Sequence, residues 1–251
     1  MRRWAVTMLA LAGLLACRSP LASNPNALWQ IVHGQCVPHA QAGGDPAPCA
    51  RVDLTAGYAV LKDNSPEKPD AYLLIPTERL TGIGSKALLQ PDAPDYWQDA
   101  WQARDLVAAQ LGRPLPRDWV GMAINSRYGR TQDQLHIHVS CLRADVRAAL
   151  ARHQAAIGAR WAAFPDPLAG ERYEAMRIDG ADLRAVAPFR LLADGIPGAR
   201  EAMDGETLAV AGIVFDGGRP GFVLLADRAD PARGNWGVAE ELLGQTCRLG
   251  R

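Results

Sequence analysis

The sequence predicts an α+β fold in which helices pack on an antiparallel sheet. Residues 135–139 alternate between apolar and polar side chains, which is the period of a half-buried strand. Residues 57–62 and 71–75 are apolar runs joined by a segment dense in turn-forming residues, which indicates an antiparallel pair. Residues 96–111 carry apolar side chains at helical spacing.

The remaining elements of the first half follow from local signals. Residues 27–33 predict a short helix, and the Gly- and Pro-rich residues 35–50 predict a loop. Asp95 is the expected N-cap of the helix 96–111, and Gly112 is its expected end. The elements predicted after this helix are strands near 119–125 and 134–141 and a helix at 144–161.

The second half shows the same mixture of strands and helices. Its predicted elements are a linker at 164–170, a strand at 173–178, a helix at 183–192 broken or begun at Pro188, strands at 207–215 and 221–226, and a short helix at 234–245. The hairpin 207–226 resembles residues 57–75 in outline. An internal duplication and two unrelated hairpins are both compatible with this likeness.

Charge limits the possible partners. The chain has 251 residues, enough for one large domain or two small ones, with 27 basic and 27 acidic side chains and a formal net charge of zero. No basic block stands out, so we expect no nucleic-acid partner held by bulk electrostatics. The sequence does not indicate an oligomeric state.

The N-terminus has the pattern of an export signal. Arg2 and Arg3 precede an apolar run that is shorter than the roughly 20 residues that span a bilayer as a helix. The run ends at Cys17 in a segment that resembles a bacterial lipobox, which makes Cys17 the lipidation candidate. An uncleaved anchor is the alternative. We therefore assign residues 1–26 to a signal or anchor followed by a tether at 18–26, and expect the rest outside the cytoplasm.

Four further cysteines remain: Cys36, Cys49, Cys141 and Cys247. An even number in an exported chain suggests two disulfides. Of the possible pairings we favour Cys36–Cys49, which closes a short loop, and Cys141–Cys247, which ties the C-terminus to the histidine-bearing strand. Metal binding is the alternative, but no CxxC pair or ligand-like spacing supports it.

A histidine pair marks the candidate site. His136, His138 and Ser140 are two residues apart, so on a strand they share one face. A metal site, ordinary structural histidines and nucleophilic catalysis are the three interpretations. We expect no metal, because no HExxH motif or further ligand motif accompanies the pair. The neighbouring Asn125 and Gln132 favour catalysis, in which a neutral imidazole attacks phosphorus and forms a phosphohistidine.

The spacing Asn125-x6-Gln132-x3-His136-x-His138 resembles that of the histidine-triad (HIT) superfamily of nucleotide hydrolases and transferases. The third histidine of that motif is replaced here by Ser140, a position at which the transferase branch also varies. The paired strands before the motif, with their Ile-Pro ending, are similar as well. The segments 101–105, 123–132 and 136–141, together with the exported N-terminus, are most similar to the bacterial CDP-diacylglycerol pyrophosphatases.

The resemblance implies a HIT-like antiparallel sheet with a catalytic region at 27–162. A C-terminal α+β portion at 163–251 would pack on the same domain, and a degenerate second HIT-like half is one interpretation of it. The implied reaction is hydrolysis of CDP-diacylglycerol to phosphatidate and CMP without a cofactor. The enzyme would be anchored in the bacterial inner membrane by its N-terminus, with its catalytic domain on the periplasmic side. The alternatives are a HIT-type hydrolase or transferase of a soluble nucleotide and a non-catalytic exported protein that binds a nucleotide or lipid.

The resemblance also implies roles for single residues. His138 would be the nucleophile, and His136 would orient the site through a hydrogen bond to the backbone. The expected substrate-binding residues are Asn125, Gln132, Ser140, Arg127, Arg130 and Lys62. The absent third histidine leaves assistance to the leaving group unassigned, although phosphatidate is already a fairly good anion and needs less proton donation.

Overall fold

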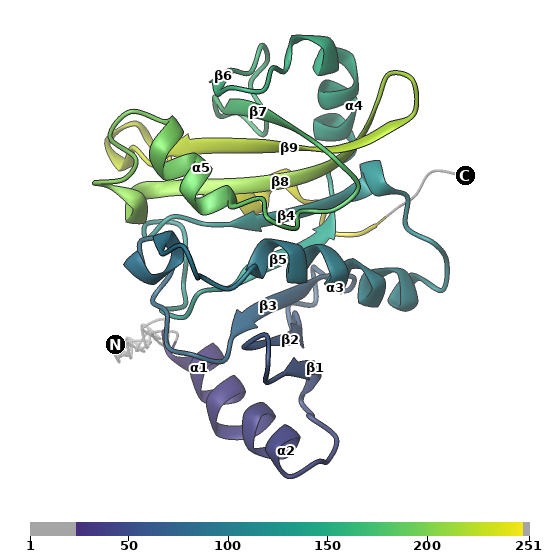
Figure 1. Ribbon diagram of the computed structural model, residues 1–251, viewed down its shortest axis with the longest axis vertical. Coiled ribbons are helices and arrows are strands. Elements are labelled where there is room, and N and C mark those ends of the chain that lie inside the picture. Colours follow the sequence, from purple (N-terminus) through teal and green to yellow (C-terminus); the bar gives the residue numbers. More distant parts are fainter. Residues whose placement is uncertain (1–23, 248–251) are drawn as a thin grey trace, which may run out of the picture.

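The computed structural model of the 251-residue chain describes residues 24–247. Within these residues, nine strands form one sheet in the order β1-β2-β3-β5-β4-β8-β9-β7-β6 (Figure 1). Every pairing in it is antiparallel. The predicted α+β class with an antiparallel sheet is therefore confirmed. The pairing of β4 with β8 joins the first half of the chain to the second.

The strands are β1 (Cys49–Asp53), β2 (Tyr58–Lys62), β3 (Tyr72–Pro76), β4 (Val120–Ile124), β5 (Ile137–Cys141), β6 (Ala162–Ala163), β7 (Glu174–Asp179), β8 (Glu206–Phe215) and β9 (Arg219–Arg228). The α-helices are α1 (Ala27–Ile31), α2 (Val37–Gln41), α3 (Tyr96–Leu111), α4 (Ala144–His153) and α5 (Pro188–Gly195). A π-helical turn, Val32–Cys36, joins α1 to α2. A 3₁₀ turn, Ala239–Leu242, lies near the C-terminus.

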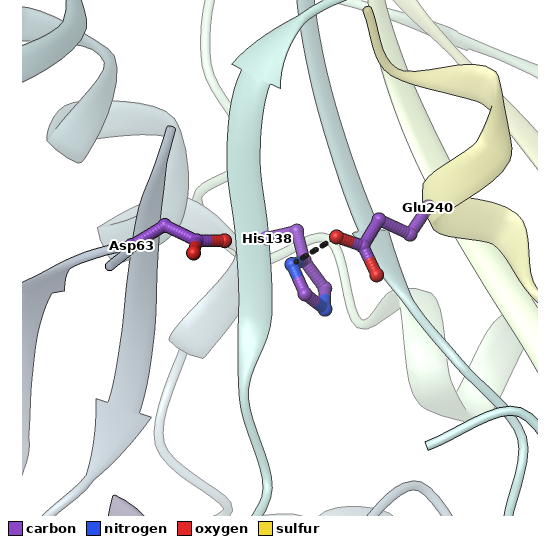
Figure 2. Close-up of side chains that lie close together, drawn as sticks. All are labelled: Asp63, His138 and Glu240. Carbon is purple, nitrogen blue, oxygen red and sulfur yellow. Dashed lines mark ion pairs between the residues drawn. The ribbon is translucent and has the colours of Figure 1, made fainter. Parts of the chain in front are cut away.

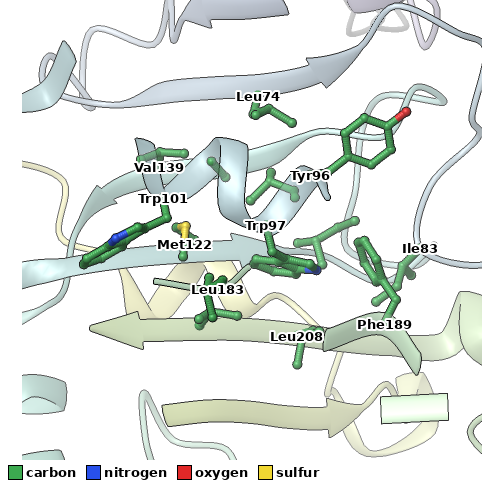
Figure 3. Close-up of a cluster of buried hydrophobic side chains, with 14 of the residues drawn as sticks. Leu74, Ile83, Tyr96, Trp97, Trp101, Met122, Val139, Leu183, Phe189 and Leu208 are labelled. Atoms are coloured by element: carbon green, nitrogen blue, oxygen red, sulfur yellow. The ribbon is translucent and has the colours of Figure 1, made fainter. Parts of the chain in front are cut away.

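Helix α3 begins and ends where the sequence predicts. The Asp95 side chain accepts a hydrogen bond from the backbone N–H of Gln98, and Gly112 ends the helix in the left-handed conformation. Its residues Trp97 and Trp101 are buried against the sheet (Figure 3). Removing an aromatic side chain of this size from a core costs about 3–5 kcal/mol, so α3 is firmly held.

The two faces of the sheet are covered differently. Helices α3 and α5 lie over one face and form the main core with it (Figure 1). The opposite face has two separate covers. Residues 27–41 pack on β2 and β3, whereas α4 and the turn Ala239–Leu242 pack on β4, β8 and β9. Strand β5 lies between these covers, so its side chains on this face border a gap in the apolar packing.

Both predicted disulfides are present. Cys36 pairs with Cys49, and Cys141 pairs with Cys247. The lipidation candidate Cys17 and most of the predicted signal and tether lie outside the described residues. Within residues 24–247, we find no helix that is long and apolar enough to cross a membrane.

Several element predictions were wrong in detail. Residues 35–50 are not simply a loop, because the helical segment continues to Gln41 and β1 begins at Cys49. Strand β1 was missed because it is a polar edge strand whose residues Arg51 and Asp53 hide the alternation.

Three helix boundaries also differ from the prediction. The helix predicted at 144–161 ends at His153, before an irregular segment that contains Gly158. The helix α5 begins at Pro188, which is one of the two predicted alternatives and suits proline in the first helical turn, but it ends at Gly195 and not at Leu192. The helix predicted at 234–245 is reduced to one 3₁₀ turn, because Gly234 and Gly237 adopt positive φ.

Candidate active site

His138 lies at the centre of the sheet. It stands on β5 between Leu73 of β3 and Ala123 of β4. Its neighbours Ile137 and Val139 point into the core beneath α3, as the alternation predicts. His138 therefore projects from the opposite face into the gap between the two helical covers, where its side chain is nonetheless buried.

Two carboxylates lie close to the His138 imidazole, and in the view of Figure 2 Asp63 is to its left and Glu240 to its right. The Glu240 Oε1 atom lies 3.1 Å from Nδ1 of His138, and an Asp63 oxygen, a Glu240 oxygen and a ring nitrogen of His138 all lie within 4.8 Å of one another. Among the described residues, neither ring nitrogen of His138 has a partner in a well-aligned hydrogen bond. The imidazole is thus buried and oriented beside a negative charge, while Nε2 is free to meet a substrate.

Glu240 is itself held in place from two directions. The Lys68 ammonium donates to Glu240 Oε1. The Asn125 amide donates to Glu240 Oε2 over 3.2 Å, and its carbonyl oxygen accepts from the Glu240 backbone N–H over 3.0 Å. Asn125 therefore positions the carboxylate that faces His138.

The loop 125–132 packs tightly on the segment that leads to Glu240. The Ser126 backbone N–H donates to Gly237 O over 2.9 Å, and the Ser126 hydroxyl donates to Trp236 O over 2.7 Å. A Cβ atom on Gly129 would lie 2.6 Å from a methyl carbon of Val238. Only glycine permits this approach, so the glycine of the loop fixes where Glu240 stands.

Both site histidines are neutral near pH 7. Burial lowers the pKa of His138 well below its ordinary value, and the nearby His136 and Lys68 lower it further. Burial also lowers the pKa of His136, although its bond to Gln134 opposes this effect. Nδ1 of His136 lies 2.8 Å from Gln134 O, and a neutral ring makes that bond by donating from Nδ1. A neutral imidazole is the form that attacks phosphorus.

A cavity of about 670 Å³ opens beside His138. Residues of α1 and β2 form its apolar walls, and charged or amide groups line the rest. Those polar residues are Lys62, Asp63, Asn64, Lys68, Asn125, Arg130, Gln132, His136, His138 and Glu240. The mixture suits a ligand that carries both phosphate groups and an organic ring.

Arg130 is the guanidinium best placed to bind a phosphate in this cavity. Its Nε and Nη1 atoms are buried without a hydrogen-bond partner among the described residues. Nη2 lies 3.4 Å from Asp133. The side chain packs closely over Gly82, where a Cβ atom would come within 2.5 Å of Nη1. Buried donors without partners are costly unless a ligand completes them.

Two predicted substrate-binding residues do not line this cavity. Arg127 is exposed and forms an ion pair with Asp204 at 3.0 Å. Ser140 is buried, and its hydroxyl lies 4.0 Å from the Sγ atom of Cys247. The structure thus brings Arg130 to the cavity and leaves Arg127 and Ser140 outside it.

Lys62 and Gln132 reach the cavity but already have partners. The Lys62 ammonium donates to the carbonyl oxygens of Pro69 and Ala71. Gln132 accepts from the Leu28 backbone N–H over 3.0 Å and donates to Asn24 O over 2.9 Å. Gln132 therefore also fixes the start of α1 against the cavity.

Asp63, Lys68 and Glu240 were not predicted. Asp63 and Lys68 belong to residues 63–69, whose composition indicated only a turn. Glu240 reaches His138 through contacts between distant segments, which no local pattern reveals. Atoms of Asp63, His138 and Glu240 lie within 4.8 Å of one another, close enough to share a metal ion. The ammonium of Lys68, bonded to Glu240, already brings positive charge to this carboxylate, so the cluster does not need a metal for charge balance.

A buried neutral histidine, backed by a carboxylate and facing unpaired cationic donors, defines an enzyme site for phosphate-ester or anhydride chemistry. Residues 23–251 match the family model described as CDP-diacylglycerol pyrophosphatase. The chain is also 44% identical over 252 residues to a CDP-diacylglycerol pyrophosphatase of Yersinia pestis, covering 99% of this chain and 95% of that relative. The chain belongs to the CDP-diacylglycerol pyrophosphatase family.

Proposed function

We propose that the protein hydrolyses CDP-diacylglycerol to phosphatidate and CMP through a covalent intermediate on His138. Family membership and the 44% identical relative support the activity. The observation that supports the nucleophile is the buried His138 imidazole, which is neutral and has a free Nε2 on the wall of a cavity that also contains the unpaired donors of Arg130.

In the first step, Nε2 of His138 attacks the phosphorus atom on the cytidine side. The bond from that phosphorus to the bridging oxygen breaks, and phosphatidate leaves with the electron pair. Attack by a neutral ring that carries its proton on Nδ1 produces a positively charged imidazole. The Glu240 carboxylate, 3.1 Å from Nδ1, stabilises that charge.

Lys68 and Arg130 supply positive charge to the pyrophosphate. Both line the cavity with His138. The Arg130 donors that lack partners suit the non-bridging oxygens, because charge-assisted hydrogen bonds from a guanidinium are strong and directional. The Lys68 ammonium, already beside Glu240, is close to where charge develops.

In the second step, water attacks the phosphorus atom of the cytidylyl-histidine, the bond from phosphorus to Nε2 breaks, and CMP leaves while the His138 ring returns to its neutral form. When Nδ1 of His136 donates to Gln134 O, the Nε2 atom of His136 is left as an acceptor. The two histidine rings lie 4.9 Å apart, edge to face. We assign His136 as the group that receives a proton from this water.

A covalent-trapping experiment tests the nucleophile. With substrate labelled in the cytidylyl phosphate, rapid acid quenching is expected to leave label on His138 and on no other residue. His138→Gln should lose both label and turnover, whereas His33→Gln, which changes an exposed histidine, should retain them. Label on a different residue, or turnover by His138→Gln at more than a few per cent of the wild-type rate, contradicts the proposal.

We further propose that the fold is related to the HIT superfamily and that residues 1–26 hold the enzyme at the periplasmic side of the bacterial inner membrane. The HIT relationship is supported by the spacing of Asn125, Gln132, His136 and His138, which all line one cavity. The location is supported by the export-signal pattern. Comparing turnover of CDP-diacylglycerol with that of soluble nucleotide diphosphates tests the alternative substrate class.

A further inference from the structure

Two exposed aromatic side chains, Tyr128 and Trp236, lie on loops next to the cavity beside His138 (the His138 cavity). Among the described residues they are two of four large hydrophobic side chains that are about half exposed, with exposed fractions of 48% and 53%. The other two, Leu54 and Val214, lie in the turn after β1 and near the end of β8. Single exposed hydrophobic residues are ordinary, but those that gather beside a functional cavity indicate an interaction surface.

Hydrogen bonds join the two loops that carry these aromatic residues. The Ser126 hydroxyl donates to Trp236 O over 2.7 Å and accepts from the Tyr128 backbone N–H over 3.1 Å. Gly129, which follows Tyr128, lines the His138 cavity, and a Cβ atom on it would lie 2.9 Å from Trp236 O. Tyr128 and Trp236 therefore belong to one surface at the rim of this cavity.

The described part of the chain begins next to the same loop. Asn24 follows the predicted anchor, and its carbonyl oxygen accepts from the Gln132 side chain over 2.9 Å. The Asp133 backbone N–H donates to Pro25 O over 2.6 Å. Because Gln132 ends the loop that carries Tyr128, an anchor held in the bilayer brings this loop close to the membrane.

We propose that the surface formed by Tyr128, Trp236 and the loops that carry them (the rim surface) contacts the phospholipid bilayer and keeps the His138 cavity open towards it. The inference rests on the proposed function, because it assumes a lipid substrate and an N-terminal anchor. Withdrawing a whole lipid from the bilayer exposes its acyl chains to water, at a cost that grows with chain length. A cavity that opens at the bilayer surface lets the headgroup reach His138 while the acyl chains stay in the membrane.

The charges of the rim surface favour a contact made by aromatic rings rather than by charge. Arg127 is paired with Asp204 at 3.0 Å, and Arg233 lies 3.9 Å from Asp230, so positive and negative groups balance. Tryptophan and tyrosine settle at the membrane–water interface, since each combines an apolar ring with a polar group. Stable membrane attachment takes two signals. The rim surface thus orients a domain that the N-terminus anchors.

Rates on membrane-bound and soluble substrates test this orientation. Full-length protein is reconstituted in phosphatidylcholine vesicles that contain long-chain CDP-diacylglycerol, and soluble short-chain CDP-diacylglycerol is added in a parallel assay. Tyr128→Ala/Trp236→Ala is expected to hydrolyse the vesicle substrate about tenfold more slowly, because without interfacial aromatic residues the cavity turns away from the bilayer. Its rate on the soluble substrate should match the wild type, because neither side chain lines the His138 cavity. Val214→Ala is the matched control, an equally exposed apolar side chain near the end of β8, and should keep both rates.

A conservative variant distinguishes loss of the contact from misfolding. Tyr128→Phe/Trp236→Tyr keeps two aromatic side chains and should retain most of the vesicle rate. Quenching by brominated phosphatidylcholine then measures the contact directly. The tryptophan fluorescence of the wild type should contain a quenched component that Trp236→Tyr lacks and that Trp161→Tyr, which changes a half-buried tryptophan, retains.

The outcomes separate the rim surface from the proposed function. Loss of the vesicle rate alone in the alanine variant, together with quenching of Trp236, supports the rim surface. An unchanged vesicle rate, equal losses on both substrates or an unquenched Trp236 overturns it. A wild-type dimer that the alanine variant converts to a monomer in sedimentation assigns the surface to a second copy of the chain, which also overturns it. If the wild type hydrolyses neither substrate, the proposed function itself fails.

Discussion

Opposing electrostatic effects act on the protonation state of the His138 imidazole. Burial, His136 and Lys68 favour its neutral form, whereas the adjacent Glu240 carboxylate favours the charged form. A nucleophile must be neutral before it attacks and positively charged afterwards. Lys68 moderates Glu240 in the resting enzyme, and the new bond to phosphorus then gives the ring the charge that Glu240 stabilises.

Glu240→Gln tests this electrostatic role. The glutamine carbonyl can still accept from Asn125, and the backbone N–H of residue 240 is unchanged, so the fold should persist. We expect kcat to fall about 100-fold, as when one stabilising group of a charged transition state is lost. Because a negative charge beside the ring is removed, the acid limb of kcat/KM against pH should move to lower pH.

The control is Glu201→Gln, since the Glu201 side chain is exposed and Glu201 lines neither the His138 cavity nor the neighbouring cavity that Glu240 also lines. It should keep the wild-type rate and profile. Wild-type kcat in Glu240→Gln would show that the carboxylate only fills space.

The two histidines also link stability to pH. Their pKa values are lowered in the folded protein, so below about pH 6.5 the unfolded chain binds more protons than the folded one. The contribution of the two histidines to the free energy of unfolding is present above their ordinary pKa. It is lost as the pH falls towards the lowered pKa values that they have in the folded protein. The double variant His136→Gln/His138→Gln should lose less stability than the wild type between pH 7 and pH 5.

Urea unfolding at the two pH values measures this difference. Asp99 acts in the opposite direction, because burial raises its pKa to about 6. Comparing variants at each pH removes that contribution, and His33→Gln should follow the wild type. An equal loss in the double variant would mean that other groups titrate.

At the residue scale, the sequence predicts one side of the site well. His136, His138, Asn125, Gln132 and Arg130 share a short segment, and all five line the cavity. The alternation along a strand and the length of a loop are local properties, so both can be inferred directly from the amino-acid sequence. Glu240 and Lys68 depend instead on side-chain contacts between segments far apart in the chain, and a single sequence carries no signal for such contacts.

At the scale of elements, the C-terminal segment that carries Glu240 is fastened at both ends. Gly237 and Trp236 bond to the loop after β4, and Cys247 is bonded to Cys141 of β5. The Cys247 backbone N–H also donates to Asp70 over 2.8 Å. The disulfide therefore connects the catalytic strand to the segment that supplies its carboxylate.

Removing the two disulfides separately should reveal their unequal contributions. The Cys141–Cys247 bridge spans a sequence separation of 106 residues, and the Cys36–Cys49 bridge spans 13. In the chain-entropy model these loops contribute about 5 and about 3 kcal/mol. The paired alanine variant at 141 and 247 should therefore unfold at lower urea concentration than the paired variant at 36 and 49. The reverse order would contradict the loop-length explanation.

The elements themselves were predictable where the local signals agree. Helix α3 has a cap, helical spacing and a terminal glycine, and β5 has strict alternation, so both were found. The sequence does not predict strand β1 or the continuation of the N-terminal helix to Gln41. These segments are stabilised by tertiary contacts, namely the pairing with β2 and the Cys36–Cys49 bridge. Tertiary contacts override weak propensity at such places.

At the scale of the whole molecule, the cavity lies close to the predicted membrane tether. Leu28 and Ile31 of α1 form part of the His138 cavity wall, and α1 follows the tether directly. Residues 18–26 reach at most about 30 Å when fully extended. An anchor at the N-terminus would therefore keep the active site within reach of lipid headgroups and raise the local substrate concentration.

Deleting residues 1–23 separates anchoring from chemistry. The truncated protein should move from the membrane to the soluble fraction and hydrolyse soluble short-chain CDP-diacylglycerol within twofold of the full-length rate. On long-chain substrate in vesicles its rate should fall at least tenfold, because it no longer concentrates at the surface. A fused histidine tag with nickel-chelating vesicles should restore that rate. Cys17→Ala distinguishes the two kinds of anchor, since it abolishes membrane attachment only if Cys17 carries a lipid. Full activity of the truncated protein on vesicles would show that the folded domain finds the membrane without its N-terminus.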